Sequence, residues 1–198
     1  MFEAIRYNLA NLAHFSGRDT RSTFWFYVLF LVIIKMVISF AVSMVPGGSV
    51  AIETVQAVRG GADDAAVQQH MFASMGGVMR VAMWASVATS FAMVIMLAAS
   101  FTRRLHDSNK TGWIAALVAV LQLLALVLTI GMIGDMAAFV SAMKLDDPKA
   151  IEAAAEMQQG KYALQGLLGW VPLLLVIVFG VWPSSDGENR YGPEPGHP

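Results

Sequence analysis

The chain has 198 residues, and 57% of them are hydrophobic even before its 17 glycines are counted, whereas soluble domains average about 45–50% with glycine included. Charged residues make up only 14%, too few to cover a water-facing surface, so the composition excludes an ordinary soluble globule. The formal net charge of −1 argues against nucleic-acid binding, and the absence of cysteine excludes disulfides, thiolate catalysis and zinc–cysteine sites.

The first predicted element is an amphipathic helix over residues 2–15. Its apolar side chains Phe2, Ile5, Leu9 and Leu12 recur at helical spacing, and the polar residues Glu3, Arg6, Asn8 and Asn11 lie elsewhere. This pattern is typical of a helix that lies in the interface between a membrane and water. We therefore predict an N-terminal interfacial helix.

Four stretches then reach the length of about 20 apolar residues that a helix needs to cross a bilayer. They are residues 24–45, 81–101, 113–133 and 164–182. Each stretch is apolar on all sides, whereas the helices of a soluble bundle have charged outer faces. The sequence predicts an all-α integral membrane protein in which residues 1–198 form one domain with four transmembrane helices.

Two long segments, 46–80 and 134–163, join these spans on the outer side of the predicted topology. The first opens on Pro46-Gly47-Gly48, and the second contains the alanine- and glutamate-rich run 150–156. Alanine and glutamate favour helices. We expect short helices in both outer loops.

The distribution of lysine and arginine predicts the orientation, since cytoplasmic segments carry the excess. The segments 1–23, 102–112 and 183–198 share one side and contain Arg6, Arg18, Arg21, Arg103, Arg104, Lys110 and Arg190. The two outer loops are longer and contain fewer, namely Arg59, Arg80, Lys144, Lys149 and Lys161. Both termini are therefore expected to be cytoplasmic.

Three polar motifs gather on that same side. They occupy residues 15–25, 103–113 and 189–193. Because the topology brings all three to one membrane face, their side chains form a candidate ligand site or a structural polar network. The candidate residues are Arg18, Arg21, Arg103, Arg104, His106, Asp107, Asn189 and Arg190.

The motifs read F-x-G-R-x-x-R-x-x-F-W, R-R-L-H-D-x-x-x-x-G-W and N-R-Y-G-P. In this order, and at these places relative to the spans, they resemble the bacterial family of small inner-membrane proteins known as domain of unknown function 805. The resemblance implies a four-span protein of the bacterial inner membrane and supplies no activity. The chain departs from the family's pattern at Asn109, at Ile114 and in its longer outer loops.

The arginines of these motifs have two interpretations. Guanidinium groups pair with carboxylates, here Asp19 and Asp107, and with backbone carbonyls, and a closed network of this kind would lock the inner helix ends. Guanidinium groups also bind lipid phosphates, and the surplus of arginines over aspartates on this side favours anionic lipid.

Lys35 is the only charged residue within the four predicted spans. Ionisable residues inside a membrane are candidates for function, and Gln122 is a polar residue at matching depth. Pro172 can kink the last span. These features support an alternative, a small transporter or channel subunit.

Catalytic signatures are absent from the sequence. His106, Asp107 and Ser108 are consecutive, so their side chains cannot converge as a catalytic triad does. The four histidines are scattered, and no phosphate-binding or dinucleotide-binding glycine motif occurs. We therefore expect a non-enzymatic envelope component without cofactor or metal, with membrane lipids, a membrane protein or a second copy of the chain as its partner.

Overall fold

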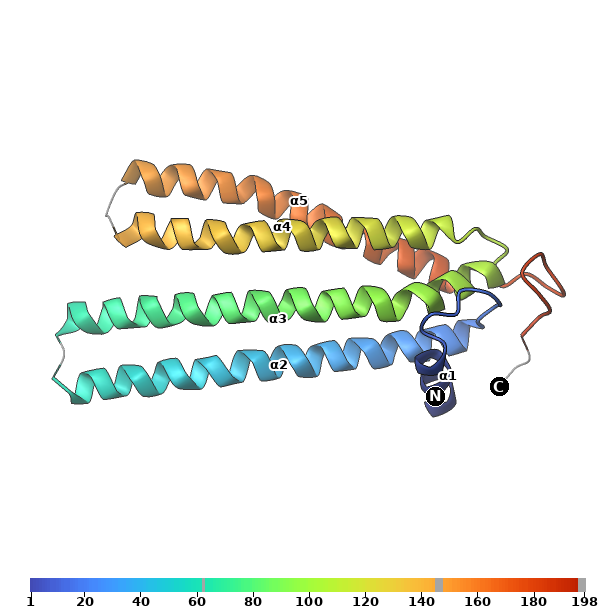
Figure 1. Ribbon diagram of the computed structural model, residues 1–198, viewed down its shortest axis with the longest axis horizontal. Coiled ribbons are helices and arrows are strands. Elements are labelled where there is room, and N and C mark those ends of the chain that lie inside the picture. Colours follow the sequence, from blue (N-terminus) through green and yellow to red (C-terminus); the bar gives the residue numbers. More distant parts are fainter. Residues whose placement is uncertain (62, 145–147, 196–198) are drawn as a thin grey trace. The chain divides into compact units, whose positions relative to one another are not determined.

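The structure, a computed structural model, describes residues 1–61, 63–144 and 148–195. Within these residues the chain forms five helices (Figure 1). They are α1 (Phe2–Ala10), α2 (Arg21–Arg59), α3 (Asp64–Asp107), α4 (Trp113–Lys144) and α5 (Pro148–Val181).

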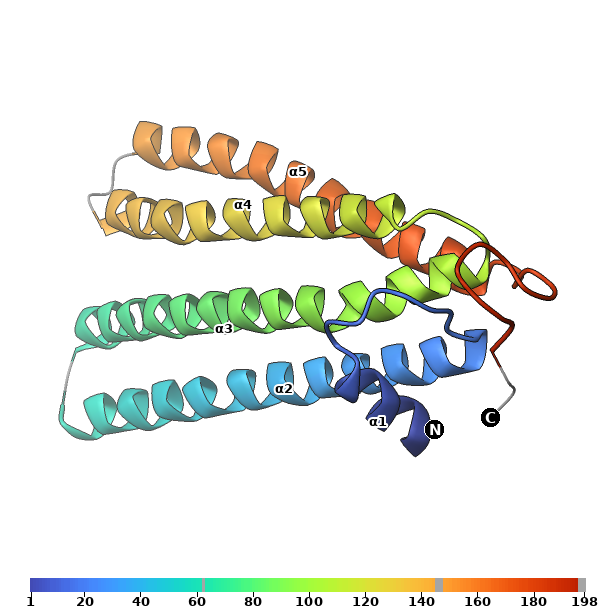
Figure 2. The same cartoon turned by 45° about the vertical axis from the view of Figure 1, so that its right-hand side comes forward.

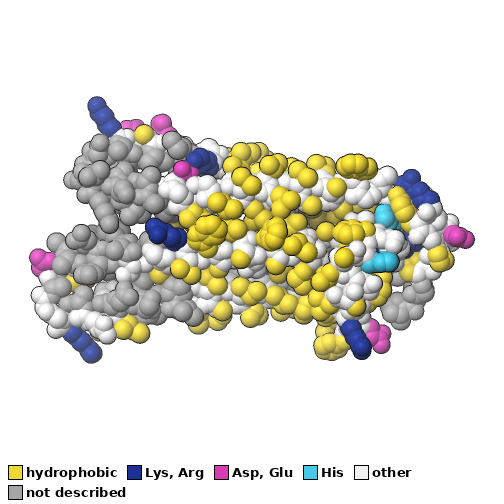
Figure 3. Space-filling model, viewed as in Figure 1, with side chains coloured by type: hydrophobic (Ala, Val, Ile, Leu, Met, Phe, Trp, Pro, Cys, Tyr) yellow, Lys and Arg dark blue, Asp and Glu magenta, His cyan; other side chains and the backbone are white. Residues whose placement is uncertain are grey.

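Each of the four long helices contains a segment that is long and apolar enough to cross a membrane. These segments are Arg21–Met44, Gly77–Asp107, Trp113–Asp135 and Gln159–Val181, and they overlap the four spans predicted from the sequence. Hydrophobic side chains cover much of the helical surface that Figure 3 shows, as is expected of helices that face lipid. The prediction of an all-α protein with four membrane spans and an N-terminal helix is thus confirmed.

The outer segments differ from the prediction in one respect. They are helical, but their helices continue the spans instead of forming separate short helices. Helix α2 passes through residues 46–48 and ends at Arg59, and α3 begins at Asp64; likewise α4 extends to Lys144 and α5 begins at Pro148.

The chain divides into two compact units. Unit 1 comprises residues 1–34, 90–127 and 163–198, and unit 2 comprises residues 35–89 and 128–162. All of α1 belongs to unit 1, and each long helix contributes one part to each unit. Both chain termini and all three polar motifs belong to unit 1.

The core of unit 1 is a cluster of buried apolar side chains from α2, α3, α4 and α5. Its members are Phe24, Phe101, Leu105, Ala115, Val118 and Val176. A second aromatic residue of α2, Tyr27, is also fully buried, and its hydroxyl donates a hydrogen bond to the carbonyl oxygen of Met96 on α3 over 3.2 Å.

Helix α1 lies beside the first turns of α2 in both ribbon views (Figures 1 and 2). Its buried side chain is Asn8, whereas Phe2 is 80% exposed and Leu9 is exposed as well. A short helix that leaves large apolar side chains uncovered, with Arg6 exposed among them, has the composition of a membrane-interface helix.

Unit 2 has few buried side chains among its described residues, with Met132 and Ile133 of α4 as examples. Its ion pair joins Lys161 Nζ of α5 to Asp135 Oδ2 of α4 over 2.5 Å. Both side chains of this pair remain partly exposed.

Candidate functional site

The three polar motifs come together at one end of unit 1, where α2 begins, α3 ends and α5 leads into the C-terminal tail. Thr20 starts α2: its side-chain oxygen accepts a hydrogen bond from the backbone N–H of Thr23 over 3.2 Å, which satisfies one of the free donors of the first turn. Asn109 ends the turn after α3 with a left-handed φ of 54°, a conformation that asparagine tolerates better than most residues.

Arg18 is the residue that ties the first motif to the other two. Its Nε and Nη2 atoms donate to Asp107 Oδ1 at the end of α3 over 3.2 and 3.1 Å. The remaining donors reach carbonyl oxygens of the C-terminal tail, at Ser185, Gly187 and Gly192. These are five hydrogen bonds, which equals the number of N–H groups on a guanidinium.

Arg103 pairs with the second aspartate of the network. Its Nε donates to Asp19 Oδ1 over 3.0 Å, and both side chains are about 1% exposed. The Asp19 backbone N–H also donates to the Arg103 carbonyl over 3.2 Å. Burial raises the pKa of the Asp19 carboxyl, and the bonds from Arg103 and Ser100 oppose this shift.

The other nitrogens of Arg103 reach α1 and the residues that follow it. Nη2 donates to Asn8 Oδ1 over 2.7 Å, and Nη1 donates to the carbonyl oxygens of Asn11, over 3.0 Å, and of His14. The guanidinium carbon lies 5.3 Å from the centroid of the Tyr7 ring, a cation–π distance. Arg103 therefore fixes the N-terminal segment onto α3.

Arg104 joins α3 to the end of α5. Its Nη1 donates to Asp107 Oδ2 over 2.6 Å, Nε donates to the Gly180 carbonyl over 3.0 Å, and Nη2 donates to the Trp182 carbonyl. Asp107 Oδ2 also accepts a hydrogen bond from the Ser184 hydroxyl over 2.5 Å. Arg103 and Arg104 are both 0% exposed.

Asp107 and Asp19 are both engaged by partners within the network. Each carboxylate is buried and accepts hydrogen bonds from at least one arginine and one serine. Buried arginines thus compensate the charge of both carboxylates, which is the arrangement of structural ion pairs. We call this buried network of Arg18, Asp19, Arg103, Arg104 and Asp107 the buried lock, because it ties the helix ends and the tail together.

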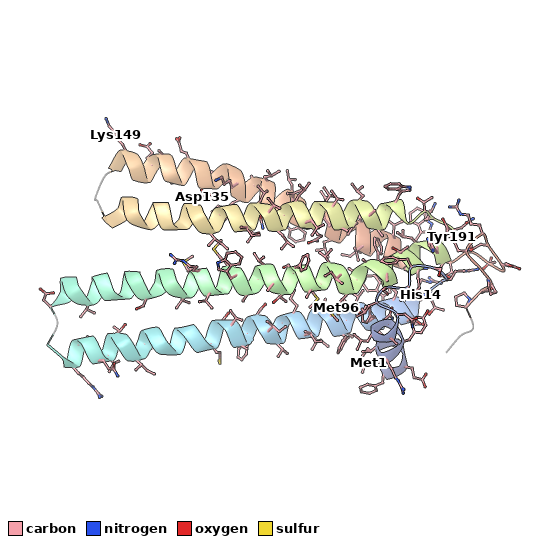
Figure 4. The ribbon with its side chains drawn as sticks, in the orientation of Figure 1. Met1, His14, Met96, Asp135, Lys149 and Tyr191 are labelled. Atoms are coloured by element: carbon pink, nitrogen blue, oxygen red, sulfur yellow. The ribbon has the colours of Figure 1, made fainter. Side chains whose placement is uncertain are left out.

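His106 packs against the third motif. Its ring stacks on the ring of Tyr191 with centroids 3.7 Å apart and planes 7° apart, and Figure 4 shows Tyr191 in the tail beyond the end of α3. Asn189 Nδ2 donates to the His106 carbonyl over 3.0 Å and to the Ser185 hydroxyl. The contacts of His106 with Tyr191 and Asn189 thus fix the C-terminal tail at the end of α3.

Arg21 and Arg190 are the predicted site residues that stay outside the buried lock. Arg190 is exposed, donates to the Asn109 carbonyl over 3.2 Å and lies over the Tyr191 ring. Arg21 is exposed and makes no hydrogen bond or ion pair with any part of the chain that the structure describes. The structure therefore separates the arginines into a buried group and an exposed group.

Lys35 and Gln122 do not belong to this site. Lys35 is exposed on α2 in unit 2, without a hydrogen bond or ion pair in residues 1–61, 63–144 and 148–195, and Gln122 is half-buried on α4 in unit 1. Pro172 is buried within α5, which continues through it. The transporter alternative built on Lys35 and Pro172 stays a prediction.

Several residues of the network were not among the sequence candidates. Asn8 is 1% exposed, and Asn11 and His14 contribute carbonyl oxygens. A polar residue on an amphipathic helix gives no sign that it will be buried. Gly180 had a weak signal, as a glycine near the end of a span: a Cβ built there would lie 2.8 Å from the Phe24 ring.

Comparison with known protein families shows to which family the chain belongs. The family model described as "Protein of unknown function (DUF805)" matches residues 12–193. The chain belongs to the DUF805 family. The matched range includes all three polar motifs and all four spans, so this DUF805 protein is a multi-pass membrane protein whose motifs build the buried lock. No curated protein and no solved structure matches the chain.

Proposed function

We propose that this DUF805 protein is a non-enzymatic component of the bacterial inner membrane that contacts anionic lipid headgroups through exposed cations at its cytoplasmic end. The observation that carries the proposal is the separation of the arginines. Arg18, Arg103 and Arg104 are buried and engaged, whereas Arg6 and Arg21 are exposed on α1 and at the start of α2.

The surroundings of the exposed cations support lipid contact. Arg6 shares α1 with Phe2, and Arg21 precedes the apolar segment of the first span. Cations beside exposed apolar side chains, at the level where a span begins, are suited to phosphate headgroups, and each contributes about 1 kcal/mol near an anionic surface. Arg190 has the acidic neighbours Asp186 and Glu188, so the contact is assigned to Arg6 and Arg21.

We propose a non-enzymatic role because of the chemistry of the described residues. The two carboxylates of the motifs are occupied by arginines, and the His106 ring is stacked on Tyr191. General acid–base catalysis needs a group that is free to exchange a proton with a substrate, and arginines engage both of these carboxylates.

Lipid retention tests the proposal. The full chain is purified in detergent with the double substitution Arg6→Gln/Arg21→Gln, and the phosphatidylglycerol that it retains is measured by mass spectrometry. At about 1 kcal/mol per cation, affinity falls by roughly thirtyfold. The matched control is Arg59→Gln/Arg80→Gln, which removes two exposed arginines from unit 2 and leaves retention unchanged. Equal retention in all three proteins would refute lipid contact and leave a protein partner.

The orientation has a separate test. The chain has no cysteine, so one introduced cysteine reports its own side of the membrane to an impermeant maleimide. In intact spheroplasts we expect Glu188→Cys to be protected and Arg59→Cys to be labelled, since the termini are proposed to be cytoplasmic. Labelling of Glu188→Cys before lysis would invert the topology.

A further inference from the structure

Unit 1 contains an open pocket of about 320 Å³ between α1 and the first turn of α2. This volume lies within the range of small-molecule sites, at its lower end. The walls come from α1, from residues 18–20, from the start of α2 and from Pro195 of the tail. Figures 1 and 2 show α1 beside the start of α2.

The lining has a polar part and an apolar part. The polar part includes the hydroxyl groups of Thr20, Ser22 and Thr23, and the apolar part includes Ala4 and Phe26. Phe26 belongs to the first membrane span, which begins at Arg21, and Thr20 lies just before it. A pocket that crosses the boundary between an apolar span and a polar end fits a molecule that is itself divided in this way, which is a phospholipid.

The charges of the lining define the headgroup. Arg18 and Asp19 line the pocket but are already engaged by Asp107 and Arg103. Glu3 is exposed on the wall and makes no hydrogen bond or ion pair with the described residues. Among the charged side chains of the lining, Glu3 is therefore the one left free, and its carboxylate attracts an ammonium group.

The hydroxyl groups suit a phosphate. Thr20 Oγ1 lies 3.0 Å from Ser22 Oγ and donates to Thr23 Oγ1 over 2.9 Å. Each hydroxyl has one proton and two lone pairs. Because Thr20 gives its proton to Thr23, Ser22 is the donor to Thr20, and the Thr23 hydroxyl keeps a proton that can turn outward to a phosphate oxygen. The exposed cations Arg6 and Arg21 do not line the pocket.

We propose that this pocket binds the headgroup of a phospholipid that carries both a phosphate and a primary amine, with the ammonium on Glu3 and the phosphate on the hydroxyl group of Thr23. The acyl chains then run along Phe26 and the exposed side of α2. Phosphatidylethanolamine has this chemistry. Phosphatidylcholine is the matched comparison, because its quaternary ammonium has no N–H to donate to a carboxylate.

The test measures which lipid the detergent-purified full chain retains from an equimolar mixture of phosphatidylethanolamine, phosphatidylcholine and phosphatidylglycerol. The wild-type chain is expected to retain phosphatidylethanolamine over phosphatidylcholine by about tenfold, the size of one charge-assisted hydrogen bond. Glu3→Gln abolishes this preference. The control is Glu156→Gln, which removes an exposed carboxylate from unit 2 and leaves the preference intact.

A second substitution tests the phosphate side of the pocket. Thr23→Ala weakens retention of phosphatidylethanolamine and phosphatidylcholine alike by a few-fold, since it removes a contact common to both. Equal retention of these two lipids by the wild-type chain, or an unchanged preference in Glu3→Gln, overturns the proposal. A preference for phosphatidylglycerol that persists in Arg6→Gln/Arg21→Gln also overturns it, because the pocket would then be an anionic-lipid site.

Discussion

Two ion pairs of similar length stand in very different surroundings. Arg104 and Asp107 of unit 1 are 2.6 Å apart, with side chains that are 0% and 1% exposed. Lys161 and Asp135 of unit 2 are 2.5 Å apart, with side chains that are 33% and 28% exposed. Judged by the nitrogen–oxygen distance alone, the two ion pairs would be equivalent.

Burial and coordination set them apart. The Arg104–Asp107 pair belongs to a network in which each remaining donor and acceptor also has a partner, so loss of one member strands the others in a dry environment. The Lys161–Asp135 pair can exchange its contact for water, and exposed pairs contribute about 0–1 kcal/mol. The buried network is therefore important for the stability of unit 1, while the exposed pair contributes little to stability.

The largest effect is expected from Asp107→Asn. The amide keeps the shape of the side chain but removes the charge that Arg18 and Arg104 share. Breaking a buried ion pair costs about 3–5 kcal/mol, to be measured as a fall in the free energy of unfolding of the detergent-solubilised protein. The paired measurement is Asp135→Asn in unit 2, which should cost less than about 1 kcal/mol. Equal losses would erase the distinction between the two regions.

A smaller loss is expected from Arg103→Lys. Lysine keeps the charge beside Asp19 but cannot also reach Asn8, Asn11 and His14, because its donors share one nitrogen. We expect the unfolding free energy to fall by about 2–3 kcal/mol. Limited proteolysis should then cut first between residues 10 and 18. Resistance equal to that of the wild type would show that α1 is held by other contacts.

Packing beside the lock is tested by Gly180→Ala. The added Cβ would lie 2.8 Å from the Phe24 ring and 2.9 Å from the Trp25 ring, and overpacking of this kind costs about 1–3 kcal/mol. The matched change is Gly160→Ala in unit 2, where no atom lies within 4 Å of the added Cβ. That variant should be neutral or gain up to about 1 kcal/mol of helix propensity. A loss at Gly160 as large as that at Gly180 would contradict the difference in packing.

The smallest effect is expected from Lys161→Met. Both partners of this pair are partly exposed, so removing the charge should change the unfolding free energy by about 0–1 kcal/mol. Thermal unfolding in detergent is sufficient to measure it. A loss above about 2 kcal/mol would mean that Asp135 depends on Lys161 as Asp107 depends on its arginines.

The spans were predictable because a membrane imposes its requirement on consecutive residues. The runs before Met44 and after Trp113 needed only their length and lack of charge to be recognised. The meeting of the three motifs also followed from the sequence, since an even number of spans returns the termini to one side. Both inferences depend on order along the chain and not on side-chain geometry.

The division of the arginines could not be predicted. Whether Arg18 or Arg21 is buried depends on where the carbonyl oxygens of Ser185 and Gly187 lie in space, and two arginines only three residues apart look alike in a sequence. The sequence also did not show that α2 continues through Pro46-Gly47-Gly48. These residues disfavour a helix by only a few kcal/mol, and a chain that leaves the helix near an apolar layer must find new partners for its backbone groups.

Arg18 and its partners in the tail are synthesised at very different times. Arg18 is made early in synthesis, but its tail partners Ser185, Gly187 and Gly192 follow 167, 169 and 174 residues later. Until the last helix is inserted and the tail emerges, the guanidinium has no carbonyl oxygens to satisfy it, and contacts so distant along the chain form late. A chain that stops short of the tail would leave three of the five hydrogen bonds of Arg18 unmade and keep only the two to Asp107.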